Sequence, residues 1–252
     1  MIQKKLIQAA FFILLAHTIA ASQAPPAVQG KVEEPIIAGT FSSGMTPGGT
    51  PVGWRQKKVA GRTRFSIVKD GETPVLRVES NGGATGLFKQ VAVDPKQHPI
   101  VVWKWKVERP VTAADEREKK TDDAAARVFV IFKDSLPGAG RFSKLKHKLA
   151  SAVSSAVPPG VALCYVWANK LSKDEVIESP YTDWVRIIAV ESGPEKAGQW
   201  LSYERNVFED FKKTFGKEPK QILGVALMSD TDNTNQSVIA HYGDIVFKAP
   251  PQ

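Results

Sequence analysis

The sequence predicts an all-β fold, a sandwich or barrel of strands with one or two short helices. Short apolar runs separated by Gly, Pro, Asn and Asp recur along most of the 252 residues, which is typical of such folds. The run at 99–108 alternates, with Val101, Trp103 and Trp105 on one face and Lys104 on the other. A single cysteine excludes an internal disulfide, so the strands must be held together by a hydrophobic core.

The chain opens with a segment typical of an export signal. Lys4 and Lys5 precede the mostly apolar stretch Leu6–Ala20, and the small residues Ala21 and Ser22 follow. We therefore expect residues 1–22 to be a cleaved signal peptide and the mature protein to be periplasmic or secreted. The alternative is an uncleaved membrane anchor, but the stretch is shorter than the ~20 apolar residues of a spanning helix.

One domain is predicted after the signal. Residues 23–35 are rich in Pro, Gln and charge, which indicates a flexible tether. Residues 36–249 suit a single β-sandwich domain, with a size that needs no disulfide to support its core. Cys164 lies in the apolar run VALCYVW, where a small buried hydrophobic residue is expected.

The predicted strands continue from the tether to the end of the chain. Strand 161–168 is apolar on both faces, which indicates a central position in the sheet. The full set covers 36–41, 64–69, 74–80, 85–93, 99–108, 125–133, 161–168, 183–190, 198–203, 221–229 and 237–248.

The segment 206–215 carries helical spacing. Asn206 is placed as the N-cap with Glu209 three residues later, and Gly216 follows as a stop. One face of this helix is apolar, with Val207, Phe208, Phe211 and Phe215.

A second helical pattern at about 140–157 is basic and forms an insertion between two strands. It can simply pack as a surface helix. The sharper hypothesis is a lid, or an element in peripheral contact with an anionic membrane surface.

The charge is moderately basic, at +8 for the whole chain and +6 once Lys4 and Lys5 leave with the signal. This suits an anionic polymer or surface, although many exported proteins are basic for solubility alone. No nucleic-acid partner is expected, because no nucleic-acid recognition motif is present.

The first polar cluster is TDDAAAR, with Asp122, Asp123 and Arg127 just before the apolar strand VFVIF. Adjacent carboxylates at a strand entrance can bind a cation, hydrogen-bond a sugar or pair with an arginine. The alternative is a solvated turn in which Asp123 caps the backbone.

The second cluster is MSDTDNTNQ, where Asp230, Asp232, Asn233 and Asn235 follow the apolar strand ILGVAL. Such oxygen-bearing side chains suit a hard cation, whereas an ordinary loop is equally compatible with them. An EF-hand is excluded, because its glycine and terminal glutamate are missing.

The third cluster is AHYGDIVF, in which Tyr242 and Asp244 are expected to share one face of the last strand. A buried carboxylate needs a partner, so Asp244 should meet Arg127, Arg205 or a cation. Across the three clusters, the predicted metal ligands for a structural Ca²⁺ are Asp122, Asp123, Asp230, Asp232 and Asp244. No other cofactor is expected.

Aromatic residues on strands offer a further hypothesis. Trp103, Trp105, Tyr165 and Trp167 could stack on sugar rings, or they could be ordinary core residues.

Several enzyme classes are excluded by their missing motifs: G-x-S-x-G, H-E-x-x-H, the P-loop and paired Cys-x-x-Cys. His98, His147 and His241 have no neighbour that suggests a triad. Hydrolysis by paired carboxylates stays open, because two suitably spaced acids suffice.

The ordered series GLFKQVAVD, WKWKV, TDDAAARVFVIF, YVWAN, RNVFEDFKKTFG and LMSDTDNTNQSVIAHYGDIVF resembles the bacterial family known as domain of unknown function 3047. The resemblance covers roughly residues 37–248. It implies an exported protein with a jelly-roll-like antiparallel β-sandwich, related in architecture to carbohydrate-binding modules. It implies no catalytic residues.

We expect binding of a polysaccharide or cell-envelope glycan, without catalysis. The alternatives are a carbohydrate-active hydrolase or lyase with paired carboxylates, and a structural envelope protein that docks through the basic helix. The candidate ligand-binding residues are Trp103, Trp105, Asp122, Arg127, Trp167, Asn169, Asp230, Asp232, Asn233, Tyr242 and Asp244.

Overall fold

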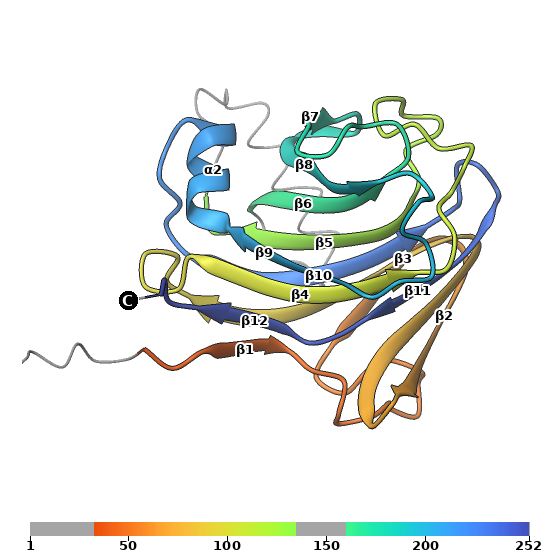
Figure 1. The fold of residues 1–252 in the computed structure, drawn as a ribbon, viewed down its shortest axis with the longest axis horizontal. Coiled ribbons are helices and arrows are strands. Elements are labelled where there is room, and N and C mark those ends of the chain that lie inside the picture. The colour runs from red at the N-terminus through yellow and green to blue at the C-terminus, as the bar shows by residue number, and fades with distance from the viewer. Residues whose placement is uncertain (1–32, 135–159, 252) are drawn as a thin grey trace, which may run out of the picture. The chain divides into compact units, whose positions relative to one another are not determined.

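The computed structural model describes residues 33–134 and 160–251 (Figure 1). The predicted signal peptide, most of the tether and the basic segment at 140–157 therefore lie outside the described residues. No helix within the described ranges is long and apolar enough to cross a membrane.

Strands make up most of the described chain, and the helix α2 interrupts them between β9 and β10. The strands are β1 (Ile36–Gly39), β2 (Arg55–Asp70), β3 (Thr73–Val93), β4 (Ile100–Val107), β5 (Ala124–Phe132), β6 (Val161–Ala168), β7 (Val176–Ser179), β8 (Thr182–Ser192), β9 (Leu201–Asn206), β10 (Ile222–Asp230), β11 (Ser237–Tyr242) and β12 (Ile245–Lys248), and the helix is α2 (Val207–Phe215).

Hydrogen bonds join these strands in one sheet with the order β1-β12-β4-β11-β3-β10-β5-β6-β8-β7, while β2 pairs with β3 and β9 with β4. Every pairing is antiparallel except that of β6 with β8. The predicted all-β antiparallel fold is confirmed.

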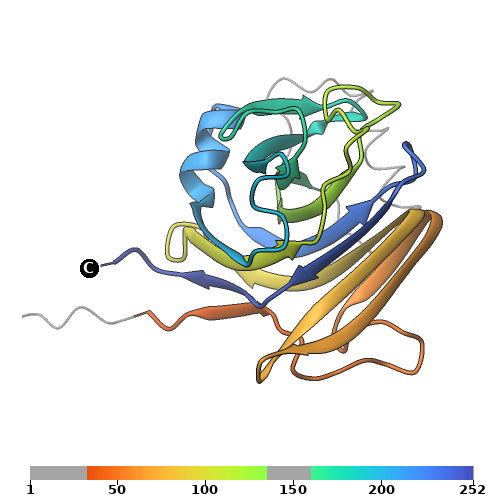
Figure 2. The ribbon, with the colours of Figure 1, turned by 45° about the vertical axis from the view of Figure 1, so that its right-hand side comes forward.

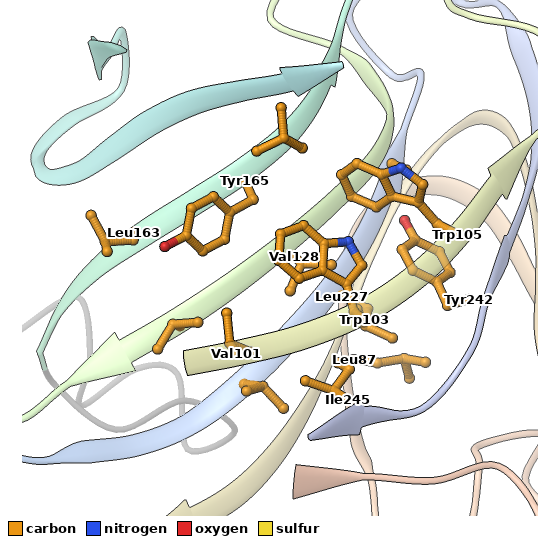
Figure 3. Packing of buried hydrophobic residues seen from close by; sticks show 14 of the residues in the cluster. Leu87, Val101, Trp103, Trp105, Val128, Leu163, Tyr165, Leu227, Tyr242 and Ile245 are labelled. Carbon is orange, nitrogen blue, oxygen red and sulfur yellow. The ribbon is translucent and has the colours of Figure 1, made fainter. Parts of the chain in front are cut away.

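The sheet curls over its own core to make the two layers of a sandwich. Trp103 on β4 stacks on Tyr165 of β6 with ring centroids 5.2 Å apart, although four strands separate β4 from β6 in the sheet. Figure 3 shows these two rings facing each other across the interior. The alternation predicted for 99–108 explains the arrangement, because it aims one face of β4 wholly inward.

The largest side chains fill this interior. Trp105, Trp167 and Tyr242 are fully buried with Trp103 and Tyr165, and their rings meet mainly in edge-on and tilted contacts. Large aromatic side chains dominate the energetics of such cores. The core therefore takes the place of the disulfides that the chain does not have.

Helix α2 forms where the sequence predicts it, and it closes one end of the core. The Asn206 side chain accepts a hydrogen bond from the backbone N–H of Glu209, and Gly216 ends the helix at φ 70°. Phe211 packs on Phe132 of β5 with centroids 4.6 Å apart. The apolar face of the helix is thus its core-facing side.

Strand β3 passes from one layer to the other at a glycine corner, which we define as Gly61, Gly82 and Gly83. The first half of β3 pairs with β11 and the second half with β10, and β2 follows it through the bend (Figure 2). Backbones touch here: a Cβ on Gly61 would lie 1.7 Å from the Gly82 carbonyl oxygen. The corner joins the two strands predicted at 74–80 and 85–93 into one.

Several strands differ from those predicted, and β9, for example, lies three residues beyond the predicted 198–203. β2 begins at Arg55, well before the predicted start at 64, and β7 was not predicted. The predicted strand 237–248 is two strands, because Gly243 and Asp244 interrupt it.

Candidate functional site

A cavity of about 280 Å³ opens on the face of the sheet opposite the core. Strands β5, β6, β8 and β10 form its floor, and the loops after β7 and β10 form its rim. The lining residues are Val59, Ala84, Asp122, Arg127, Phe129, Cys164, Ser179, Tyr181, Val185, Ile187, Met228, Asp230, Asp232 and Asn233.

Alternation along the strands explains why polar groups can stand on a buried sheet. On β5, Val128 faces the core while Arg127 and Phe129 face the cavity. On β10, Leu227 faces the core while Met228 lines the cavity. Each strand therefore contributes one face to the core and the other to the site.

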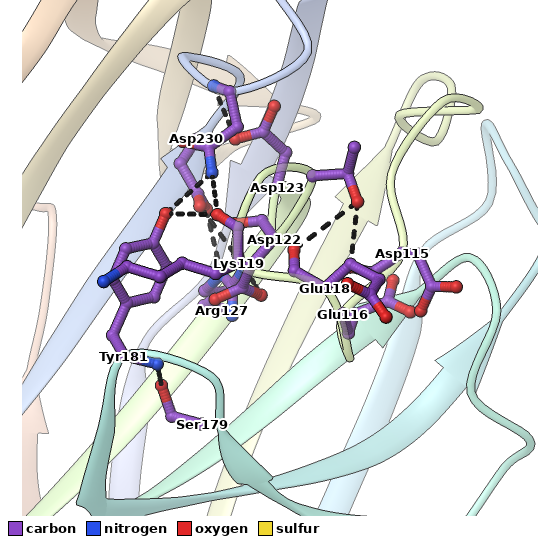
Figure 4. A network of polar contacts seen from close by, with 12 residues as sticks. Asp115, Glu116, Glu118, Lys119, Asp122, Asp123, Arg127, Ser179, Tyr181 and Asp230 are labelled. Carbon is purple, nitrogen blue, oxygen red and sulfur yellow. Dashed lines mark hydrogen bonds and ion pairs between the residues drawn. The ribbon is translucent and has the colours of Figure 1, made fainter.

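Arg127 holds two carboxylates in place at the bottom of the cavity (Figure 4). Its Nε donates to Asp230 Oδ1 at 2.9 Å, and its Nη2 donates to Asp122 Oδ1 at 2.7 Å. Nη2 also donates to the Asp122 carbonyl oxygen at 3.0 Å and to Asp230 Oδ2 at 3.3 Å. The three side chains are only 5–8% exposed, so water contributes little to their solvation.

Burial and charge shift the pKa values of this group in opposite directions. Burial raises the pKa of the Asp230 carboxyl to about 7, against the lowering effect of Arg127, and the pKa of Asp122 is raised for the same reason. Burial acts to lower the pKa of Arg127, but the Asp230 and Asp122 carboxylates together raise it well above its usual value. Burial also raises the pKa of the Cys164 thiol to about 12, so this thiol stays protonated.

A pH-dependent stability follows for Asp230. Because its pKa is higher in the folded protein than in the unfolded chain, the folded state binds the extra proton between about pH 4 and 7. The extra proton therefore stabilises the folded state at low pH, and this contribution is lost as the pH rises through about 7. The free energy of unfolding falls with a slope of at most about 1.4 kcal/mol per pH unit. We expect urea denaturation of wild type, compared with Asp230→Asn, to show this slope. Equal pH profiles would contradict it.

Asp123 fixes the loop after β10 to the strand entrance of β5. Its Oδ2 accepts from the backbone N–H and the hydroxyl of Thr234, both at 2.6 Å, and its Oδ1 accepts from the backbone N–H of Asn233 at 3.2 Å. The alternative prediction, a solvated turn in which Asp123 caps the backbone, holds only in part. Asp123 does accept from backbone N–H groups, but it is fully buried and those groups belong to a loop distant in sequence. This cap places Asp232 and Asn233 at the edge of the cavity.

Tyr181 completes the rim from the turn between β7 and β8. Its hydroxyl donates to the Lys119 carbonyl at 2.8 Å and accepts from Asn233 Nδ2 at 2.7 Å. The residue remains 51% exposed, and Lys119 Nζ lies 5.1 Å from the ring centre. Three loops distant in sequence thus meet around one accessible aromatic ring.

Glu116 anchors the loop that leads into Asp122. This fully buried carboxylate accepts hydrogen bonds from the backbone N–H groups of Asn169, Lys170 and Leu171. The loop between β4 and β5 is thereby tied to the end of β6, which fixes the direction from which Asp122 enters the site.

We expect Glu116→Ala to lower the free energy of unfolding by about 3 kcal/mol, because three backbone N–H groups lose their acceptor. Glu118→Ala, an exposed change in the same loop, is the control and should have little effect. Chemical denaturation of the two variants measures the difference, and equal stabilities would show that Glu116 does not anchor the loop.

The family described as protein of unknown function (DUF3047) matches residues 52–246. The chain belongs to this family. No curated protein matches the sequence.

Solved structures with a similar fold share little sequence with this DUF3047 chain. CtCBM11 has a TM-score of 0.41 and 12% identity, covering 86% of this chain and 96% of that one. The xyloglucanase domain of NopAA from Sinorhizobium fredii has a TM-score of 0.40 and 8% identity, covering 78% and 93%. The Spr0440 Endo-D glycoside hydrolase domain of Streptococcus pneumoniae R6 has a TM-score of 0.34 and 10% identity, covering 79% of this chain and 22% of that chain. The DUF3047 chain spans about a fifth of that last protein's length.

The DUF3047 structure brings together two of the three polar clusters predicted from the sequence. Asp122 and Arg127 of the first meet Asp230, Asp232 and Asn233 of the second around the cavity. The first cluster leads into β5 and the second begins at the end of β10, and these two strands are hydrogen-bonded neighbours. Asn169 lies apart from the cavity, where its side chain bonds to Glu116.

The third cluster is divided between two places. Asp244 is exposed and lines a different hollow with Lys104, so the predicted shared face and pairing with Arg127 or Arg205 are wrong. Alternation fails here because Gly243 breaks the strand. Tyr242 is buried on the core side, where its hydroxyl donates to the Met228 carbonyl at 2.7 Å.

The prediction that three tryptophans form a sugar-stacking surface is corrected by their burial. Trp103, Trp105 and Trp167 are 2%, 0% and 0% exposed, so no ligand reaches their faces. They lie on the inward side of the alternation and are core residues. The accessible ring at the site belongs to Tyr181. This residue was not among the predicted site residues, because it lies in a turn beside a short edge strand.

Asp123, Asp230 and Asp232 place carboxylate oxygens within 4.8 Å of one another. Asp123 already serves the loop backbone and Asp230 already serves Arg127. A cation would have to compete with those partners, and the Ca²⁺ site stays a prediction.

Proposed function

We propose that this DUF3047 protein is exported and that its cavity binds a neutral sugar unit of a polysaccharide or cell-envelope glycan, without catalysis. The observation that carries the proposal is the convergence of Asp122, Arg127 and Asp230 in one cavity that has the exposed Tyr181 ring at its rim. Sugars present hydroxyl groups at their edges and C–H groups on their faces. Carboxylates bind the former, and an aromatic ring binds the latter.

The site is held in place before any ligand arrives. Arg127 fixes the two carboxylates at the floor, and the contacts among Asn233, Lys119 and Tyr181 fix the rim. Preorganised groups lose little conformational entropy on binding. A volume of about 280 Å³ is near the lower end of ligand pockets, which span roughly 300–1,000 Å³, and suits a single sugar unit.

The charge of the cavity favours a neutral sugar over an acidic one. Asp122, Asp230 and Asp232 supply three carboxyl groups, and Arg127 is the single basic residue among the described lining residues. An acidic sugar would place a further carboxylate beside them, and like charges repel. We therefore expect the cavity to bind a neutral oligosaccharide more tightly than its uronate counterpart.

Isothermal titration with matched neutral and uronate oligosaccharides tests the proposal. Tyr181→Ala should weaken binding of the neutral ligand roughly two- to tenfold, from an aromatic contribution of ~0.5–1.5 kcal/mol. Asp232→Asn should also weaken it, while Asp183→Asn, an exposed change outside the lining, should not. If Tyr181→Ala left the affinity for the neutral ligand unchanged, the proposed site would be contradicted.

One observation favours a second candidate, a carboxylate-dependent hydrolase or lyase. The raised pKa of Asp230, at about 7, suits a general acid or base at neutral pH. Against it, both oxygens of Asp230 already accept from Arg127. If the wild type cleaves a glycan and Asp230→Asn abolishes the cleavage, the enzyme is supported. If the wild type binds the glycan without cleaving it, the binding function is supported.

A further inference from the structure

Strand β2 carries a run of positive charge. Lys57, Lys58, Arg62 and Arg64 fall within eight residues that contain no acidic residue, and all four are exposed. Within the described ranges β2 hydrogen-bonds only to β3, so its outer edge is open (Figure 1). No carboxylate of the described residues forms an ion pair with Lys58 or Arg62.

A hollow of about 530 Å³ lies along this charged strand, and a second of about 410 Å³ lies next to it. The first is lined by Lys58, Arg62 and Asn81, and the second by Arg109 and Ser237. They adjoin, because the Ser237 hydroxyl donates to Asn81 Oδ1 at 3.0 Å. We call this surface the basic groove, formed by Lys58, Arg62, Asn81, Arg109, Gln236 and Ser237.

Strand register explains why these residues share one surface. Arg62 pairs with Asn81, and Asn81 pairs with Ser237, so the three stand in one row across β2, β3 and β11. Paired residues of neighbouring strands point to the same face. Val59 and Ala84 point the other way and line the sugar cavity, so the basic groove is separate from that cavity.

The groove offers cations, amides and hydroxyls, with no acidic residue among its described lining residues. Neither hollow is lined by an aromatic side chain that could stack on a base, or by a long aliphatic one that could enter a lipid layer. A chain that carries both hydroxyl and anionic groups matches this lining. These are the groups of an acidic polysaccharide.

Charges on an edge strand also serve to prevent pairing between molecules. Charges that only prevent such pairing need to lie on the edge strand, and they do not need to line a hollow together with residues of other segments. Arg109 lies beyond the end of β4, yet it lines the second hollow beside Ser237. We propose that the basic groove binds an acidic polysaccharide, as a second binding surface of this protein.

The test measures binding of the purified full-length chain to polygalacturonate and dextran sulfate, with uncharged dextran as the reference. We expect both acidic polymers to bind and dextran not to bind at the groove. The affinity for the acidic polymers should fall as added salt shortens the Debye length from about 10 Å to about 3 Å. The variant Lys58→Glu/Arg62→Glu/Arg109→Glu should weaken binding about tenfold or more.

The control variant Lys173→Glu/Lys213→Glu/Lys220→Glu makes the same change in net charge at exposed sites elsewhere and should keep most of the affinity. Equal losses in the two variants would show that net charge alone drives binding, which overturns the groove. Tighter binding to single-stranded DNA or anionic vesicles than to either polysaccharide would also overturn it. Tyr181→Ala should leave binding of the acidic polymers unchanged. A negative result for the basic groove can therefore be distinguished from a negative result for the sugar cavity.

Discussion

Replacing Arg127 with methionine is expected to lower the free energy of unfolding by about 3–5 kcal/mol. Methionine keeps much of the volume but removes the guanidinium that holds Asp122 and Asp230, which are both buried. Two carboxylates would then be left without their cation in a site that water scarcely reaches. Urea denaturation at pH 8, above the pKa of about 7 of Asp230 in the wild type, measures the loss.

The variant Arg117→Met provides the matched control. Arg117 also contacts two carboxylates, those of Asp115 and Glu175, but at the surface, where screening by water makes such pairs weak. We expect only a small change in its stability. Adding Asp122→Asn and Asp230→Asn to Arg127→Met should restore part of the loss, because the uncompensated charges are removed. A loss at Arg127 no larger than that at Arg117 would contradict the network.

A second large effect is expected at the glycine corner. Gly61 has φ +50° and Gly71, in the turn of the same hairpin, has φ +59°, so alanine is strained at both positions. A Cβ at Gly71 meets nothing within 4 Å, whereas one at Gly61 would lie 1.7 Å from the Gly82 carbonyl oxygen. Gly71→Ala should cost about 1–3 kcal/mol from the backbone alone.

Gly61→Ala should cost clearly more than Gly71→Ala, because β2 and β3 must move apart where β3 changes layers. We expect an additional loss of about 2 kcal/mol or more, similar to that of overpacking a core. Thermal or chemical denaturation of the two variants isolates the steric contribution, since the backbone strain is nearly matched. Equal losses would show that the corner tolerates a side chain and that the close approach is not essential.

The fold was largely predictable because alternation and turn residues are local signals. The strands at 99–108 and 161–168 and the helix with Asn206 as N-cap all follow from neighbouring residues. The bend in β3 could not be predicted in this way, because it depends on Gly61 of another strand meeting Gly82 across the sheet. Such a contact leaves no local pattern.

The site was predictable in part for the same reason. Asp122, Arg127 and Asp230 stand out as charges beside apolar strands, and their convergence needed only that β5 and β10 be neighbours. Alternation separates the two faces of a strand but does not say which face is interior, so the tryptophans were misassigned. Tyr181 carries no sequence signal, because its role depends on loops that meet only in three dimensions.

The most direct test of the sugar cavity uses methionine methyl groups as reporters. Met228 lines the cavity and Met45 does not, and the chain has only three methionines. We expect titration of ¹³C-methyl-methionine-labelled protein with a neutral oligosaccharide to shift the Met228 signal to saturation while the Met45 signal stays fixed. Saturable binding that leaves Met228 unshifted would contradict the assignment of the cavity as the glycan site.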